Sequence, residues 1–231
     1  STITPAVTVR IEDANDNLVT SDTRNVTLAI GTNPSSGTLS GTTTVAASGG
    51  VATFSTLSID NAGNGYTLSA TSSPALTGAT SSTFDITTGS ATKLAFGQQP
   101  TNTAAGSSIS PAITVLIQDA GGNTVTGDNS TQVTLAIVAN PGSGTLSGTT
   151  TVTASSGVAT FSNLSINKTG TGYTLGATSS PALTGATSST FNITPGSATK
   201  LVFGQQPTNT TATSTITPAV TVRIEDANDN L

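Results

Sequence analysis

Four residue types are missing from this chain of 231 residues: cysteine, methionine, tryptophan and histidine. Without cysteine there is no disulfide and no thiolate metal site, so each domain depends on its apolar core. Without histidine and cysteine, the usual catalytic base and thiol nucleophile are absent, and the few acidic residues are not paired at acid/base spacing. The sequence therefore predicts that the chain is not an enzyme. The lack of both sulfur side chains also removes the most oxidisable groups, which suits a location outside the cell.

Charge is scarce as well. Charged residues make up 7% of the chain, the net charge is −5, and no basic run is present. Such a surface does not neutralise phosphates, so nucleic acid is excluded as a partner. No apolar run is long enough to span a bilayer, so we expect no membrane insertion in this segment. There is neither an initiator methionine nor a signal peptide, and we expect these residues to be an internal part of something longer.

The chain contains three copies of one segment. STITPAVTVRIEDANDNL occupies residues 1–18 and recurs unchanged at residues 214–231, and a diverged copy, SSISPAITVLIQDAGGNT, lies at residues 107–124. The equivalent prolines Pro5, Pro111 and Pro218 give a period of 106 and then 107 residues. A repeat of this length is a small domain, because solenoid units run to roughly 20 to 50 residues. We therefore expect tandem domains, like beads on a string.

Within one repeat the apolar residues alternate as they do in half-buried strands. We expect a loop and one short strand over residues 31–50, and a bulge or turn after Phe54, where the alternation changes phase. The six phenylalanines and two tyrosines recur in equivalent places, so we interpret them as core; a stacking surface for sugars or bases is the alternative. The residues expected to point inward are Val7, Val9, Ile11, Val26, Leu28, Ile30, Tyr66, Leu68, Ala70, Phe84 and Ile86, with the further aromatics Phe54, Phe96, Phe161, Tyr173, Phe191 and Phe203.

Polar linkers mark the predicted domain boundaries. TTGS precedes Ala91, and the similar segment TPGS occupies residues 194–197. The sequence predicts an Ig-like domain lacking its first strand at residues 1–90, a complete one at 91–196, and the first two strands of a third at 197–231.

About seven short strands in 100 residues, with frequent turn signals, are typical of an antiparallel sandwich. The GxGY elements ending at Tyr66 and Tyr173 look like the tyrosine corner of Greek-key sandwiches. VTVRIEDANDNLVTSDTRNVTLAI followed by GVATFSTLSIDNAGNGYTLSAT resembles the bacterial immunoglobulin-like domains of the invasin and intimin type. The resemblance implies an all-β fold of tandem Ig-like Greek-key sandwiches in a long surface adhesin, stalk or extracellular fibre. In that family, receptor binding usually resides in a different, terminal domain.

One turn gathers four oxygen-bearing side chains, which is the ligand chemistry of calcium. These residues are Asp13, Asn15, Asp16 and Asn17, and they recur as Asp226, Asn228, Asp229 and Asn230. The middle copy reads Asp119, Gly121, Gly122 and Asn123 and loses half of these ligands. Ordinary turn chemistry explains the same residues, so both interpretations stay open and no other cofactor is expected.

Two modifications are compatible with the sequence. An isopeptide bond between Lys93 and Asn192 fits the order of the first and last strands, although a lone lysine commonly guards a strand edge. Glycosylation sequons, relevant only in a host that glycosylates asparagine, occur at Asn25, Asn129, Asn163, Asn167, Asn192 and Asn209.

Together these features predict a structural spacer or stalk repeat of a secreted, cell-surface fibre. Its expected partners are copies of itself, end to end as in strand donation into a filament, and side by side because little charge repels them. An arbitrary cut through a continuous array explains the chain ends equally well. Donation fails if residues 197–213 pack only against their own chain or are disordered. The alternative is an adhesin module that binds a glycan or a cell-surface protein through a sandwich face, its threonine rows or a loop.

Overall fold

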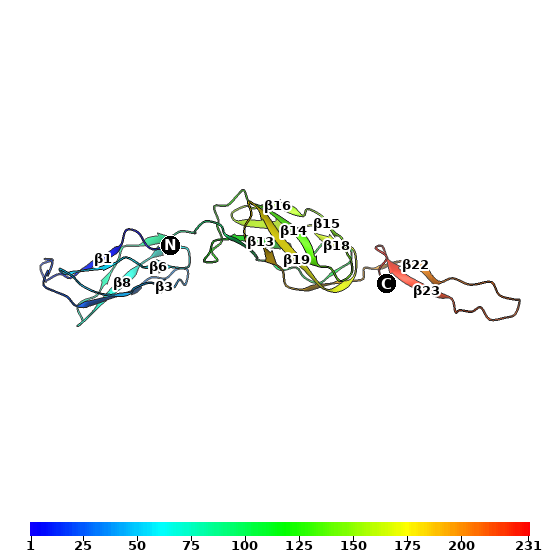
Figure 1. Ribbon diagram of the computed structural model, residues 1–231, viewed down its shortest axis with the longest axis horizontal. Helices are drawn as coiled ribbons and strands as arrows, with labels where there is room; N and C mark the ends of the chain where they lie inside the picture. The colour runs from blue at the N-terminus through cyan, green and yellow to red at the C-terminus, as the bar shows by residue number, and fades with distance from the viewer. The chain divides into compact units, whose positions relative to one another are not determined.

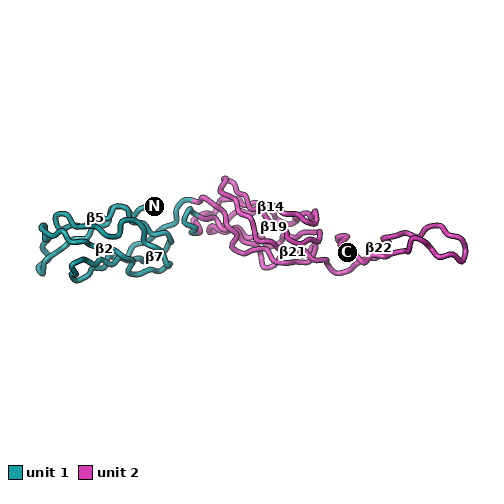
Figure 2. The backbone as a smooth tube through the Cα atoms, turned by 60° about the horizontal axis from the view of Figure 1, so that its bottom comes forward, with its two compact units in different colours: residues 1–90, 119–123 teal, residues 91–118, 124–231 magenta.

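A computed structural model describes all 231 residues and shows an all-β chain. None of its elements is a helix long and apolar enough to cross a membrane. The residues group into two compact units (Figure 2): unit 1 comprises residues 1–90 and 119–123, and unit 2 comprises residues 91–118 and 124–231. The predicted fold class, tandem antiparallel Ig-like sandwiches, is confirmed. The finer division at residues 90/91 and 196/197 stays a prediction.

Unit 1 is built from ten short strands, and Figure 1 labels β1, β3, β6 and β8 among them. Its main sheets have the orders β4-β2-β8-β9 and β1-β5, with the small pairs β10-β7 and β3-β6 beside them. The strands are β1 (Val7–Arg10), β2 (Asn25–Ile30), β3 (Leu39–Ser40), β4 (Thr44–Ala46), β5 (Val51–Phe54), β6 (Ser58–Ile59), β7 (Gly63–Tyr66), β8 (Leu68–Ser73), β9 (Ala79–Thr80) and β10 (Phe84–Ile86).

The alternation predicted for unit 1 is confirmed. Along β2, Val26 and Leu28 are buried while their neighbours Thr27 and Ala29 are exposed. The predicted break after Phe54 separates β5 from β6. Residues 31–50 form two short strands, β3 and β4, rather than the single one expected, because Leu39 and Val45 each anchor a separate pairing.

Unit 2 contains one complete sandwich and one additional hairpin. A sheet of order β11-β13-β17 faces a sheet of order β12-β21-β19-β14-β16, with β20 on β19, β15 paired with β18, and the separate hairpin β22-β23. The strands are β11 (Lys93–Phe96), β12 (Thr103–Ala104), β13 (Ile113–Gln118), β14 (Gln132–Ala139), β15 (Leu146–Ser147), β16 (Thr151–Thr153), β17 (Val158–Phe161), β18 (Ser165–Ile166), β19 (Gly170–Ser180), β20 (Ala186–Thr187), β21 (Phe191–Thr194), β22 (Ala198–Gln205) and β23 (Thr221–Asp226).

The core of the complete sandwich lies between its two sheets. Val115 and Phe161 from one sheet meet Leu135, Tyr173 and Leu175 from the other, and each of these side chains is at most 2% exposed. The entry segment contributes to both sheets, because β11 pairs antiparallel with β13 whereas β12, beyond Pro100, pairs parallel with β21. The first segment of the repeat thereby ties the two layers together.

The hairpin β22-β23 corrects one prediction about the aromatic residues. Phe203 lies on β22 and is 53% exposed, so it is not a core residue in this chain. Phe84 and Phe96 are only half-buried, whereas Phe54, Phe161 and Phe191 are buried. The reason is that β22 and β23 pair only with each other and have no second sheet to cover them.

Candidate functional site

The same five-residue turn follows β1, β13 and β23, which are equivalent strands of the three copies of the repeat. In these turns, residues 13–17, 119–123 and 226–230, the first aspartate accepts a hydrogen bond from the backbone N–H of the last asparagine, at 3.0, 2.9 and 2.9 Å respectively. The fourth position has a positive φ each time: 62° at Asp16, 91° at Gly122 and 61° at Asp229. Glycine, aspartate and asparagine tolerate that left-handed conformation best, which explains how the middle copy keeps the shape after losing two polar side chains. We call this element the Asp–Asn turn.

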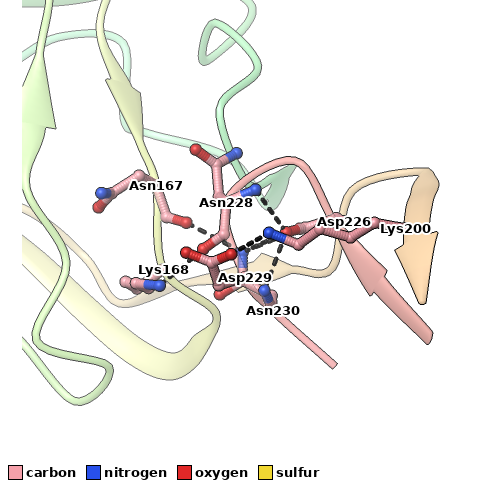
Figure 3. Close-up of polar contacts among 7 residues, drawn as sticks. All are labelled: Asn167, Lys168, Lys200, Asp226, Asn228, Asp229 and Asn230. Atoms are coloured by element: carbon pink, nitrogen blue, oxygen red, sulfur yellow. Dashed lines mark hydrogen bonds and ion pairs between the residues drawn. The ribbon is translucent and has the colours of Figure 1, made fainter. Parts of the chain in front are cut away.

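In unit 2 the last asparagine of the turn also binds a neighbouring loop. Asn230 Nδ2 donates to the carbonyl oxygen of Asn167 at 2.9 Å (Figure 3). Asn230 Oδ1 accepts the N–H of Thr169 at 3.0 Å. The side-chain amide of Asn230 thus donates one hydrogen bond to the backbone of residues 167–169 and accepts another from it. Lys168 adds a hydrogen bond from Nζ to the carbonyl oxygen of Asn228 (2.6 Å). Asn230 is buried in this position, being 5% exposed.

Unit 1 contains the same contact at equivalent positions. Asn123 Nδ2 donates to the carbonyl oxygen of Asp60, and Asn123 Oδ1 accepts the N–H of Ala62, both at 2.9 Å. Residues 119–123 group with unit 1 although the chain on either side of them belongs to unit 2. The loop side chains differ between the two sites, but only loop backbone atoms make this pair of bonds.

A buried tyrosine holds each of these loops from the inner side. The hydroxyl of Tyr173 donates to the carbonyl oxygen of Lys168, and that of Tyr66 donates to the carbonyl oxygen of Asn61, both at 2.9 Å. Both tyrosines are 0% exposed. The predicted tyrosine corners are therefore present. Each fixes the loop backbone between the two atoms that the asparagine binds.

The aspartate of the turn binds the segment that leads into its own repeat. Gly196 N–H donates to Asp226 Oδ2 (2.8 Å), and Gly89 N–H donates to Asp119 Oδ2 (2.9 Å). Desolvation by burial raises the pKa of Asp226, but hydrogen bonds from Asn230, Gly196 and Asn228 outweigh it and hold the pKa well below the usual range. The pKa of Asp119 is lowered for the same reason, by bonds from Gly89 and Asn123 acting against burial.

The first Asp–Asn turn differs because nothing is docked on it. All five residues from Asp13 to Asn17 are exposed. Hydrogen bonds from the backbones of Asn17 and Asn15 lower the pKa of Asp13 and satisfy its carboxylate locally. No group of three or more His, Cys, Asp or Glu side chains is placed to hold a metal ion. Calcium binding by Asp13, Asn15, Asp16 and Asn17 stays a prediction, and turn chemistry accounts for the contacts described.

A groove of about 380 Å³ lies beside this first turn, within unit 1. It runs along β1 and reaches the segment after β8, and its lining includes Val9, Ile11, Asp13, Ala70, Leu76 and Thr77. In the complete sandwich the equivalent place holds β11, where Leu94 donates its N–H to the carbonyl oxygen of Thr184 (2.8 Å) and is 4% exposed. The groove thus corresponds in position to β11 of the complete sandwich, and polar and apolar side chains both line it.

The predicted modification sites have varied surroundings. Asn25, Asn129, Asn163 and Asn209 are exposed, whereas Asn167 and Asn192 are half-buried. Asn192 Oδ1 accepts the N–H of Gly172 (3.0 Å). Lys93 lies on β11 and Asn192 lies on β21, and these strands belong to different sheets. Contrary to the expectation from the sequence, the strand order therefore does not favour an isopeptide bond between them. Glycosylation stays a prediction.

Sequence reasoning missed the main role of the last asparagine. The sequence suggests Asn17 and Asn230 as calcium ligands, yet Asn230 and the equivalent Asn123 bind loop backbone. A signal was available: the first aspartate and the last asparagine are kept in all three copies, while the middle of the turn changes to glycine.

Comparisons with known proteins give distant structural similarities. No family model and no curated protein matches the sequence. Among solved structures, domains 4–9 of the surface layer protein SbsC match with 17% identity and a TM-score of 0.34, over 96% of this chain and 31% of that one. A 282-residue C-terminal fragment of intimin, solved with the intimin-binding domain of the translocated intimin receptor, matches with 17% identity and a TM-score of 0.25, over 86% of this chain. The chain spans 31% and 60% of these two structures, less than two thirds of either.

Proposed function

We propose that this chain is a spacer segment of a long extracellular or cell-surface stalk, in which each repeat adds length and resists unfolding and proteolysis. It is proposed to have no catalytic role, because its residues offer neither a histidine or cysteine nucleophile system nor a metal cluster.

One observation carries this proposal. The Asp–Asn turn binds the Tyr-fixed loop twice, at equivalent positions and with distances that agree to within 0.1 Å. A flexible linker would leave such groups in water, where they need no partner. Recurring directional bonds of this kind hold the turn and the loop in place, which supports a repeat that resists unfolding.

The composition supports the extracellular setting. The chain has no sulfur side chain to oxidise, and its net charge is only −5 over 231 residues. Outward-facing strand positions are filled by neutral hydroxyl residues, such as the Thr27–Thr44 and Thr134–Thr151 pairs, whose Oγ1 atoms are 2.9 Å apart. These threonine rows are also the surface that the adhesin alternative would use for a glycan.

The test is a series of chains with two, three, four and six complete repeats, measured by small-angle X-ray scattering. For a spacer with fixed joints, the maximum dimension rises by a constant increment per repeat. For freely jointed beads it rises roughly with the square root of repeat number, and that outcome would contradict the proposal. The adhesin function would be favoured if the same chains bound saturably to a glycan array or to cells and their maximum dimension did not rise by a constant increment per repeat.

A further inference from the structure

We propose that the complete sandwich bears tension along the chain, and that its entry segment and exit segment together form a clamp that resists this tension. The entry segment comprises residues 92–105, which contain β11 and β12, and the exit segment comprises residues 184–194, which contain β20 and β21. The chain enters the sandwich through the first and leaves it through the second. This inference deepens the proposed spacer function and rests on it only for its purpose.

The entry and exit segments run side by side in the same direction. Lys93 forms a parallel bridge with Thr184, and farther along both segments β12 pairs in parallel with β21. At the first of these places the N–H of Leu94 donates to the carbonyl oxygen of Thr184 (2.8 Å). At the second the N–H of Ala105 donates to the carbonyl oxygen of Thr194 (2.8 Å). Backbone hydrogen bonds therefore join the two segments at both of their ends.

Two side-chain amides join the segments between those ends. Pro100 lies in the middle of the entry segment and has no N–H to donate to a backbone ladder. On one side of it, Gln99 Oε1 accepts the N–H of Ser189 at 2.9 Å. On the other side, Asn102 Oδ1 accepts the N–H of Asn192 at 2.7 Å. The contact between the two segments thus continues across the proline.

These bonds give a role to the motif GQQPTNT, which contains Gln99 and Asn102. The motif occupies residues 97–103 and recurs unchanged at residues 204–210. Each of the two bonds joins residues that are 90 positions apart in the chain. Amides in ordinary turns bond nearby backbone instead, as Asn140 does with a residue four positions away. The two amides of the motif therefore fasten the beginning of the sandwich to its end.

The parallel direction of the two segments decides how their bonds respond to tension. Neighbouring parts of the chain pull at residue 91, where the entry segment begins, and at residue 195, where the exit segment has ended. Because the segments run in the same direction, this pull slides one along the other and loads all the bonds between them together. Several hydrogen bonds must then break in one step, which makes forced unfolding slow.

The first experiment pulls single molecules of the full chain in two directions. Since the chain has no cysteine, handles attach only at introduced ones. Ser90→Cys with Ser197→Cys applies force along the two segments, whereas Ser108→Cys with Ser197→Cys applies it at the end where both segments finish; all three serines are exposed. At equal force we expect the second geometry to unfold about tenfold faster or more, because β12 and β21 then separate one bond at a time.

The second experiment compares variants in the first pulling geometry. Gln99→Ala and Asn102→Ala each remove a contact between the segments, and each should speed unfolding under load about fivefold, the equivalent of one net hydrogen bond. Asn163→Ala is the matched control, because Asn163 makes two hydrogen bonds with Thr149 in the same sandwich, and both residues lie outside the two segments. It should lower the equilibrium stability in urea to a similar extent and leave the unfolding rate under load unchanged.

Two results would overturn the clamp: equal unfolding rates in the two pulling directions, or equal acceleration under load by Asn102→Ala and Asn163→Ala. Either of them, combined with a constant length increment per repeat in scattering, would leave the spacer function standing. Loss of that increment together with direction-dependent unfolding would contradict the spacer function and support the clamp.

Discussion

At the scale of single residues, the last asparagine of an Asp–Asn turn can bond the aspartate of its own turn and can also bind the backbone of a neighbouring loop. In every copy its side-chain amide bonds the aspartate of its own turn, as Asn17 does with Asp13 and Asn230 with Asp226. Only Asn123 and Asn230 also bind loop backbone. The exposed Asn17 is thus a natural control for substitutions at the other two.

Asn230→Ala should release the loop that it holds. The N–H of Thr169 loses its acceptor, and we expect its hydrogen-exchange protection to fall by about tenfold, in line with one net hydrogen bond of ~1 kcal/mol and a freed loop end. The measurement is residue-resolved exchange by NMR. Asn17→Ala loses the same bonds inside its turn and should leave Thr169 unchanged; an equal loss in both variants would refute a specific role for Asn230.

The docked turns should also respond to acid in a defined window. The pKa of Asp226 is lowered in the folded chain, so its bonds stabilise the fold above the unfolded value of about 3.9 and are lost as the pH falls from there through the folded pKa. The amide shift of Gly196, which donates to this carboxylate, should stay constant from neutral pH to about pH 4 and move only below it. Movement of that amide centred above pH 5 would contradict the assignment.

At the scale of elements, nearly the same strand sequence, KLAF at residues 93–96 and KLVF at residues 200–203, exists in two environments. β11 lies against β13 with Leu94 buried, whereas β22 lies against β23 with Leu201 71% exposed. Pairing with one neighbouring strand is therefore not enough to bury the side chains; the second sheet does it. This agrees with the general rule that a two-stranded hairpin needs a further layer for stability.

Leucine truncation on the two strands should accordingly differ in cost. Leu94→Ala removes buried methyl groups and should lower the free energy of unfolding of unit 2 by about 2 to 5 kcal/mol. Leu201→Ala changes a surface side chain and should stay within about 0.5 kcal/mol. Urea unfolding at a concentration where the chain is monomeric measures both. Similar costs would mean that β22 is covered in solution.

Much of the element structure follows from the sequence alone. Alternation places Val26, Leu28 and Leu68 in the core, because one face of each strand is buried. The switch of the entry segment from one sheet to the other at Pro100, and the exposure of Phe203, do not follow. Both depend on which strands are available as partners, and the pattern within a strand does not encode that. The docked turns were missed because their bonds join residues 61 to 63 positions apart and use loop backbone.

At the scale of the whole molecule, the chain has two separate apolar cores. One core cluster contains Leu28 and Phe54, and the other contains Leu135 and Phe161, at equivalent positions of their repeats. No buried apolar residue belongs to both clusters. Each core should therefore unfold as a cooperative unit of its own.

Substitution in one core should leave the other core intact. Leu28→Ala should lower the stability of unit 1 by about 2 to 5 kcal/mol, and Leu135→Ala should do the same to unit 2. The double variant should show additive effects within about 0.5 kcal/mol, since the sites share no partners. Residue-resolved hydrogen exchange in denaturant separates the two units. A single shared transition that both substitutions shift equally would show one cooperative body.

The loop bonds made by Asn123 and Asn230 do not depend on the loop side chains, because they go to backbone atoms. Asp60 and Ala62 in one loop are equivalent to Asn167 and Thr169 in the other. Any repeat that keeps the tyrosine and the turn can then be inserted beside any other without a compensating change. Duplication or loss of whole repeats by unequal recombination would preserve the hydrogen bonds between each Asp–Asn turn and its loop. The number of repeats can thus change over generations without a penalty in folding.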